Sequence, residues 1–228
     1  MVMKLMSSKI MSRIIFIILL CVFIVSAFLL AKSYYDRKMP LINLKHIEKE
    51  VITGDGQFDW DKFESSVSIN YRNLSWLQID DVLSLPVAQV NDNFYLLDKD
   101  LNGKYALTGS LFIDYKVEKP YEQAKTIIYG HNMIGGEGMF TSLLNYYNDN
   151  EFFNKHKKGT VYTKDKKYTL EIAKAVKVDA TNSDIYDLNT TEYMEENQKY
   201  VLMSTCVTAY SRDRIVVYAK IVKEEIRK

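Results

Sequence analysis

The chain contains two cysteines, and one of them, Cys206, ends the apolar run YVLMSTC (residues 200–206). A polar loop follows it, and Arg212 and Arg214 come close behind. A thiol at the junction of a strand and a loop is held firmly and is still accessible, which suits a reactive group. A thiol is a strong nucleophile as the thiolate, and a neighbouring imidazole or guanidinium favours that form. The pattern therefore predicts nucleophilic chemistry at Cys206; a buried, inert cysteine is the alternative.

Three histidines are available as a base. His46 lies in the stretch that follows a long apolar segment, and His156 lies among lysines in NKHKKG, so we expect both to be solvated. His131 instead ends the apolar run TIIYGHN, which makes it a strand-end residue like Cys206. We therefore expect His131 to be the acid/base partner of the thiol, with a hydrogen-bonded turn histidine as the alternative.

The two arginines occupy different positions. Arg214 opens the run RIVVYAKI, where side-chain alternation places it on one face with Val216. If this run pairs antiparallel with the run that ends at Cys206, the loop of residues 207–213 returns Arg214 to the thiol. Arg212 lies within that loop and is expected to be a solvated charge. A thiol, an imidazole and a guanidinium in one cluster are suited to acyl transfer.

The N-terminal region predicts export from the cytoplasm. Residues 14–31 contain no charged residue, and eighteen residues at roughly 1.5 Å each are long enough to cross a hydrocarbon core of about 30 Å. Lys4, Lys9 and Arg13 precede this span without any acidic residue, which favours a cytoplasmic N-terminus. We expect an uncleaved single-pass membrane anchor; the alternative is a signal peptide cleaved after Val25-Ser26-Ala27.

This topology divides the chain into a basic leader (1–13), an anchor (14–31), a juxtamembrane helix and linker (32–58) and an extracellular domain (59–228). Cys21 lies in the anchor, so Cys206 is the only thiol in the exported part and is unpaired. Three of the 30 basic residues precede the anchor, which leaves 27 against 29 acidic residues. This balance gives no electrostatic reason to expect nucleic-acid binding.

The exported part predicts a mainly β fold. We expect a helix over residues 59–74, capped by Asp59, and helical insertions at 140–153 and 191–200. Eight short strands in fewer than 150 residues indicate a closed β-barrel, because closure removes exposed edges. The second helical insertion precedes the last two strands. The strands are expected near residues 76–79, 85–90, 109–114, 126–131, 159–164, 168–178, 200–206 and 214–222.

These motifs, taken together and in this order, resemble the sortases, which are cysteine transpeptidases on the surface of Gram-positive bacteria. The resemblance rests on YGHN (129–132), STC (204–206) and RIVV (214–217). Met203 stands where the family usually has leucine before STC, and Val207-Thr208 stand where an acidic pair often follows the cysteine. Three further stretches resemble class B sortases: WLQI (76–79), PVAQ (86–89) and GSLFIDY (109–115).

The resemblance implies an eight-stranded sortase barrel and transpeptidation in two steps. Cys206 attacks the threonine carbonyl of a C-terminal sorting signal, His131 transfers protons, and Arg214 binds the oxyanion or the substrate backbone. Class B enzymes are similar in preferring an Asn-Pro-x-Thr-type signal, and the expected acceptor is a peptidoglycan amine or, less often, a pilin lysine. No metal or other cofactor is implied. The residues expected to line the substrate groove are Ser204 and Thr205, with Tyr186 and Ile185 as weaker candidates for the opposite wall.

Two hypotheses from other classes stay open at this point. An exported hydrolytic cysteine protease would not divert its product to an added amine, whereas a transpeptidase would. A non-catalytic exported ligand-binding module, for haem for example, would take up ligand regardless of Cys206. The 17 tyrosines offer ligands and stacking faces for such a module, but the composition of β-strands explains their number better.

Overall fold

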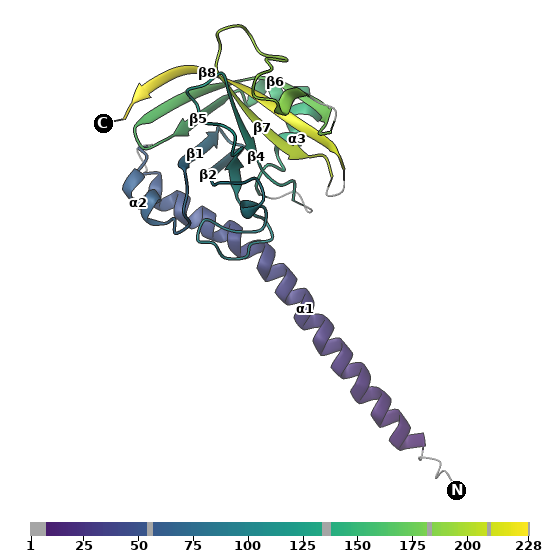
Figure 1. The fold of residues 1–228 in the computed structure, drawn as a ribbon. Helices are drawn as coiled ribbons and strands as arrows, with labels where there is room; N and C mark the ends of the chain where they lie inside the picture. Colours follow the sequence, from purple (N-terminus) through teal and green to yellow (C-terminus); the bar gives the residue numbers. More distant parts are fainter. Residues whose placement is uncertain (1–7, 54–56, 134–137, 182–183, 209–210, 228) are drawn as a thin grey trace. The chain divides into compact units, whose positions relative to one another are not determined.

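The computed structural model of the chain describes residues 8–53, 57–133, 138–181, 184–208 and 211–227. The chain divides into two compact units, Met1–Met39 and Pro40–Lys228. Helix α1 (Ser8–Val51) begins in the first unit and ends in the second (Figure 1). Each unit has its own pattern of exposed and buried apolar residues.

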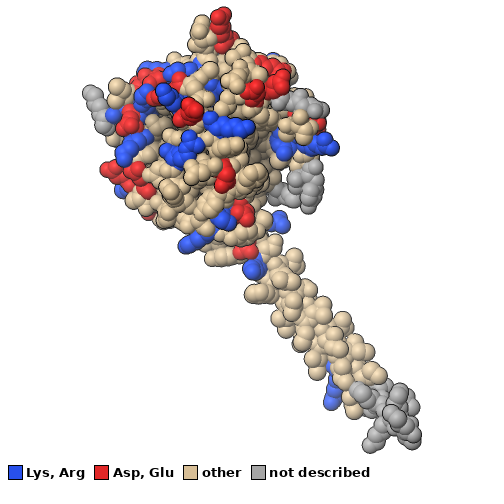
Figure 2. Space-filling model, viewed as in Figure 1, with Lys and Arg blue, Asp and Glu red and all other residues tan. Residues whose placement is uncertain are grey.

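In the first unit, α1 exposes its apolar side chains. The large apolar side chains between residues 10 and 30 are exposed, and the most apolar eighteen-residue window has a mean hydropathy of 3.3 and is not buried at all. Figure 2 shows a long part of this helix without a charged side chain. Among the described residues, α1 is the one helix that is long and apolar enough to cross a membrane.

The second unit is built around a closed β-barrel, as the sequence predicted. Within the described residues, eight strands follow the order β1-β2-β3-β4-β7-β8-β6-β5 around the barrel (Figure 1). The β2–β3 and β4–β7 pairs are parallel and the other pairs are antiparallel. The strands are β1 (Asn73–Ile79), β2 (Leu83–Gln89), β3 (Leu111–Ile113), β4 (Lys125–Tyr129), β5 (Lys158–Tyr162), β6 (Lys166–Asp179), β7 (Tyr200–Cys206) and β8 (Asp213–Ile226).

Side chains alternate between the two faces of the barrel wall. Along β7, Val201 and Met203 belong to the cluster that fills the barrel. Tyr200 and Leu202 instead join a second buried cluster with Tyr218 of β8, on the outer face. Because successive residues of a strand point to opposite faces, Cys206 continues the outer row and lies on the outside of the barrel.

The segment before the barrel contains the C-terminal part of α1 and a shorter second helix. In the C-terminal part of α1, Leu41 and Leu44 pack on the barrel core, and Val51 is buried. Helix α2 (Trp60–Ser65) is capped by Asp59, whose side chain accepts a hydrogen bond from the Lys62 amide at 3.1 Å.

The prediction that this second helix continues to Leu74 was wrong. The hydroxyls of Ser65 and Ser66 donate to backbone carbonyls within α2, at 2.8 and 2.7 Å, where the helix ends. Leu74 belongs to β1 instead, where it pairs with Ala88 of β2. Pairing within the β1–β2 hairpin therefore outweighs the local helical periodicity at Leu74.

Neither of the two predicted helical insertions forms a single helix. The first forms two short helices, α3 (Leu143–Asn148) and α4 (Asn150–Lys155), because Asp149 has an extended backbone and caps α4. Residues 191–199 form turns rather than the predicted helix. Tyr193 and Asn197 both have a backbone φ of 60°, which a right-handed helix excludes. Short 3-10 helices occur at η1 (Tyr95–Leu97) and η2 (Asp184–Tyr186), the latter between β6 and β7.

Candidate active site

Cys206 and Arg214 lie opposite each other on neighbouring strands. In the antiparallel pair of β7 and β8, Cys206 is paired with Arg214 and Ser204 with Val216, as the sequence predicted. Cys206 and Arg214 are both half-buried, and alternation places both side chains on the outer face of the barrel. The short loop between the strands therefore brings the guanidinium to the side of the sheet that carries the thiol.

The register between β4 and β7 brings His131 to the same place. These strands are parallel, and Tyr129 is paired with Ser204. The Gly130 amide continues the ladder by donating to the Ser204 carbonyl at 3.2 Å. Two residues beyond the Tyr129–Ser204 pair, the same register sets His131 beside Cys206.

Two side chains tie the segment around His131 to the end of β7. The Thr205 hydroxyl, which is 1% exposed, donates to the Gly130 carbonyl at 2.9 Å. The Asn132 amide donates to the Val207 carbonyl, also at 2.9 Å. The imidazole and the thiol are therefore held between hydrogen bonds on both sides, which limits their relative movement.

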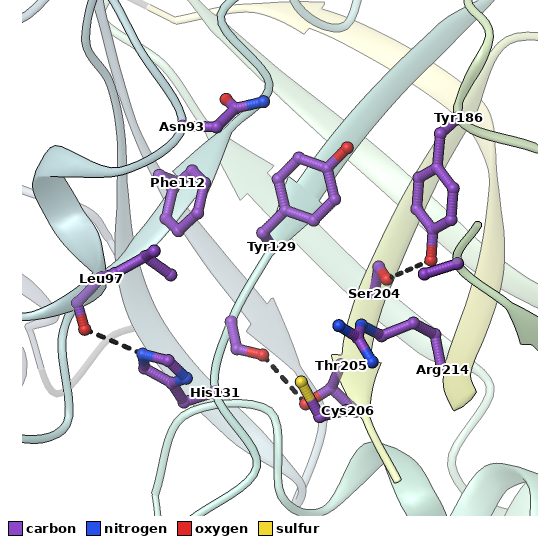
Figure 3. A pocket seen from close by; sticks show the side chains of 12 residues that line it. Asn93, Leu97, Phe112, Tyr129, His131, Tyr186, Ser204, Thr205, Cys206 and Arg214 are labelled. Atoms are coloured by element: carbon purple, nitrogen blue, oxygen red, sulfur yellow. Dashed lines mark hydrogen bonds between the residues drawn. The ribbon is translucent and has the colours of Figure 1, made fainter. Parts of the chain in front are cut away.

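These residues line a cavity of about 350 Å³. Figure 3 shows the Cys206 sulfur between the His131 ring and the Arg214 guanidinium. A cavity of this size falls within the range that ligand pockets occupy in proteins. Its lining residues are Asn93, Leu97, Phe112, Tyr129, Gly130, His131, Ala180, Tyr186, Ser204, Thr205, Cys206 and Arg214.

The His131 ring is oriented by a backbone carbonyl. Its Nε2 lies 2.8 Å from the carbonyl oxygen of Leu97 (Figure 3). A carbonyl oxygen only accepts hydrogen bonds, so Nε2 carries a hydrogen and, in the neutral ring, Nδ1 is the acceptor nitrogen. The contact therefore selects one tautomer of the neutral imidazole.

Arg214 is held by the loop that precedes it. Its Nη1 donates to the carbonyls of Ser211, at 2.6 Å, and Asp213, at 3.1 Å. These bonds fix the plane of the guanidinium on the side of the cavity where Cys206 lies (Figure 3). Arg212, in contrast, is exposed and does not line the cavity.

The wall of the cavity opposite Leu97 carries Tyr186. Its hydroxyl shares a hydrogen bond of 2.8 Å with the Ser204 hydroxyl, and its ring stacks on Tyr129 at a centroid distance of 6.1 Å. Burial raises the pKa of Tyr186, and the Ser204 hydrogen bond acts in the opposite direction. The Tyr186 hydroxyl therefore stays protonated at neutral pH and is available as a hydrogen-bond donor.

Ile185 does not line the cavity. It is 1% exposed and packs against Ile127, Leu202 and Val216 in the outer cluster. It therefore supports the segment that carries Tyr186 without reaching the cavity. Thr205 does line the cavity, but its hydroxyl is directed to Gly130. Of the groove residues expected from the sequence, Ser204 and Tyr186 are the two with hydroxyls on the outer face.

Several lining residues were not anticipated from the sequence. Asn93 and Leu97 lie in the loop after β2, which reaches the site through tertiary packing and has no local signature. Tyr129 could have been found, because it precedes His131 by two residues and therefore shares its face. Its hydroxyl donates to the Asp114 carboxylate at 2.8 Å, and Asn93 donates to the same oxygen at 3.1 Å.

The other two histidines lie elsewhere. His46 is exposed on α1, with Nδ1 3.4 Å from the Glu50 carboxylate. His156 ends α4, half-buried rather than fully solvated as expected, with Nδ1 2.9 Å from the Phe152 carbonyl. Within the described part of the chain, no group of three or more histidines, cysteines or acids is arranged to hold a metal ion.

Comparison with known proteins agrees with this arrangement. The family model described as "Sortase domain" matches residues 79–222. A sortase B of Staphylococcus aureus is 27% identical over 235 residues, covering 91% of this chain and 95% of the relative. A sortase B of Listeria monocytogenes is 28% identical over 165 residues, covering 68% and 65%. The solved Staphylococcus aureus sortase B–substrate complex has a TM-score of 0.67 at 27% identity, covering 82% of this chain and 97% of that one.

The structure combines a closed barrel of mixed strands with a cavity on its outer face that holds a thiol, an imidazole and a guanidinium. This combination defines a class of cysteine transpeptidases. Since the family model covers more than half of the chain, the chain belongs to the sortase family. Its relatives among the curated proteins and the solved structures are class B enzymes, and class B is the type of sortase that this chain represents. The resemblance noted in the sequence motifs is confirmed.

Proposed function

We propose that this enzyme cleaves a C-terminal sorting signal after its threonine and transfers the new carboxyl end to an amine of peptidoglycan. The observation that carries the proposal is the convergence of Cys206, His131 and Arg214, from three separate strand ends, on one cavity. Each of the three has a distinct role in acyl transfer.

In the first step, the Cys206 thiolate attacks the carbonyl carbon of the threonine. The carbonyl oxygen becomes an oxyanion, and the Arg214 guanidinium stabilises it because its donors are already oriented by the loop carbonyls. His131, protonated at Nδ1, gives that proton to the departing amide nitrogen. The carbon–nitrogen bond breaks, the C-terminal tail leaves as an amine, and a thioester joins the substrate to Cys206.

In the second step, an amine attacks the thioester. Neutral His131 accepts the proton from this amine at Nδ1, and the carbon–sulfur bond breaks. The Cys206 thiolate and the His131 imidazolium are thereby restored, so protons and charge balance over the cycle. Hydrolysis follows the same path with water as the nucleophile, which is why the acceptor decides between transferase and protease activity.

The groove is suited to a short polar signal of the Asn-Pro-x-Thr type. The hydroxyls of Tyr186 and Ser204 and the amide of Asn93 line the cavity, so polar backbone and side-chain groups of a peptide find partners there. The rings of Tyr129 and Phe112 supply apolar surface beside them. A proline ring, which has no N–H, is accommodated on such a surface without leaving a donor unpaired.

The enzyme acts from the outer surface of the membrane in this proposal. The apolar part of α1 is the anchor, the basic leader stays in the cytoplasm, and the barrel is exported. Sorting signals and peptidoglycan precursors are both accessible at that surface. Anchoring therefore restricts the enzyme to the place where both of its substrates occur.

The test uses the full-length chain in detergent micelles and a library of fluorescent pentapeptides of the Asn-Pro-x-Thr type. Cleavage after threonine in the presence of an added oligoglycine amine should give a new amide product. Cys206→Ala should abolish cleavage, and Cys21→Ala, which changes the other cysteine, should leave it intact. Cleavage that yields the free acid at any amine concentration would show a hydrolase instead, and transfer to a pilin lysine peptide alone would show a pilin-polymerising enzyme.

A further inference from the structure

A buried lysine lies beneath the cavity wall that carries Tyr186. Lys125 opens β4 and is 2% exposed, on the outer face that it shares with Ile127 and Tyr129. A lysine ammonium is almost never buried to this extent unless its hydrogen-bonding capacity is met, because losing hydration is costly. Its position in the structure therefore requires partners.

Within the described residues, the hydrogen-bond partners of the ammonium all belong to one turn, residues 184–190. Lys125 Nζ donates to the Ile185 carbonyl at 3.0 Å, to the Asp187 carbonyl at 2.7 Å and to the Thr190 hydroxyl at 3.2 Å. An ammonium has three donors, so these three acceptors use them completely. Burial lowers the pKa of Lys125, and the nearby carboxylates of Asp187 and Glu192 act in the opposite direction.

The two backbone carbonyls flank Tyr186. Lys125 therefore donates hydrogen bonds to the backbone immediately before and immediately after the residue that forms the cavity wall. The Tyr186 hydroxyl reaches Ser204 at 2.8 Å, and its ring lies over Tyr129. Below the turn, Ile185 is buried in the outer cluster. The turn is thus held from the far end of β4, the strand that leads to His131.

We infer that Lys125 is a positioning residue for substrate recognition, which clamps the 184–190 turn so that Tyr186 is preformed as a wall of the peptide groove. The inference rests on the proposed function for its consequence in catalysis. It is independent of that function in its structural part, because the clamp acts on the enzyme without substrate.

The test compares Lys125→Met in the wild-type and Tyr186→Ala backgrounds, using the sorting peptide that the wild type cleaves fastest. Met keeps much of the volume and removes the ammonium. We expect KM to rise about tenfold in Lys125→Met with kcat within about twofold, because the clamp preorganises binding rather than chemistry. In the Tyr186→Ala background, Lys125→Met should add nothing further. Equal losses in both backgrounds would overturn the inference.

Hydrogen exchange gives a readout without substrate. The Asp187 amide donates to the Asp184 carbonyl within the turn, and its exchange should accelerate in Lys125→Met and not in Lys158→Met, which changes the exposed first residue of β5. Unchanged exchange in Lys125→Met would overturn the inference. Accelerated exchange in an enzyme that cleaves no peptide would sustain the clamp and refute the proposed function.

If Lys125→Met does not fold, Thr190→Val tests the same clamp with the lysine in place. This variant removes one acceptor of the ammonium and the hydroxyl that lies 2.6 Å from the Asp184 carbonyl. We expect a smaller rise in KM, on the order of threefold, that again disappears in the Tyr186→Ala background. A loss in kcat with KM unchanged would show that the turn acts on the chemistry and not on Tyr186.

Discussion

At the scale of single residues, the orientation of His131 decides which nitrogen serves the proposed proton transfer. The Leu97 carbonyl accepts from Nε2, so Nδ1 is the nitrogen that we propose for this transfer. The Thr205 and Asn132 hydrogen bonds then set the distance between the imidazole strand and the thiol strand. The position of the His131 segment and the tautomer of its ring are therefore set by contacts with the backbone carbonyls of Leu97, Gly130 and Val207.

His131 is expected to be indispensable. His131→Ala should lower kcat/KM by about 10²–10⁴, because general acid and general base catalysis are both removed. His156→Ala is the matched control: its imidazole is bonded to the end of α4 and lies outside the cavity. Turnover of a sorting peptide by both variants, each checked for folding by circular dichroism, is the measurement. Loss of activity in His156→Ala with normal activity in His131→Ala would refute the assignment.

The two arginines should also differ sharply. Arg214→Ala should lower kcat by about 10²–10³, the usual effect of removing an oriented oxyanion donor, whereas exposed Arg212→Ala should have little effect. Arg214→Lys should not restore activity, since an ammonium lacks the planar fork that the Ser211 and Asp213 carbonyls orient. Single-turnover kinetics on a sorting peptide separate these cases. Near-normal chemistry in Arg214→Ala would mean that the oxyanion is bound elsewhere.

At the scale of elements, strand pairing brings distant residues together. The alternation along β7 and β8 was readable in the sequence, so the pairing of Cys206 with Arg214 could be predicted. The parallel pairing of β4 with β7 could not, since no local pattern sets the register between strands that far apart. Asn93 and Leu97 were missed for a similar reason, because they reach the cavity only when the loop after β2 packs on the barrel.

The helical insertions show a different limit. Residues 191–199 contain good helix formers, but Tyr193 and Asn197 both have a left-handed backbone, which interrupts a right-handed helix at two places. Asp149, in contrast, could have been recognised from the sequence as a helix boundary, since aspartate is a strong N-cap. The cap at Asp149 could be read from the sequence, whereas the left-handed backbone at Tyr193 and Asn197 could not.

Thr205 gives a prediction at the element scale. Thr205→Val keeps the shape and removes the hydrogen bond between β7 and the His131 segment, so kcat should fall about tenfold as the thiol and imidazole lose their alignment. The free energy of unfolding should fall by about 1 kcal/mol. Thr126→Val is the control: its hydroxyl accepts from the Tyr121 amide at 2.7 Å, away from the site, so stability should fall similarly with kcat within about twofold. Equal effects of the two variants on kcat would argue against a role for the Thr205–Gly130 hydrogen bond in aligning the thiol and the imidazole.

At the scale of the whole molecule, the apolar part of α1 and the barrel unit have surfaces of different character. The apolar part of α1 has no charged side chains over a long stretch, whereas acidic and basic groups are interspersed on the visible face of the barrel unit (Figure 2). Near-neutral balance, with 30 basic and 29 acidic residues in the chain, gives no long-range attraction for a strongly charged polymer. We therefore expect localisation to depend on the apolar helix and not on charge.

The proposed membrane anchor in α1 gives a prediction at the scale of the whole molecule. The full chain should remain in the membrane pellet after an alkaline carbonate wash, and protease added outside intact cells should digest the barrel while sparing the basic leader. Deletion of residues 1–31 should release the barrel into the soluble fraction. Recovery of a secreted form that begins near Phe28 would show that the apolar segment is a cleaved signal peptide.

The most direct test of the central claim is the intact mass of the enzyme during turnover. Full-length protein mixed with a sorting peptide and quenched in acid should gain the mass of the acyl fragment up to threonine, and peptide mapping should place it on Cys206. An added amine should discharge the adduct, Cys21→Ala should form it normally, and Cys206→Ala should not form it. Peptide cleavage by a folded enzyme with the adduct on another residue, or by Cys206→Ala at the wild-type rate, would contradict the account.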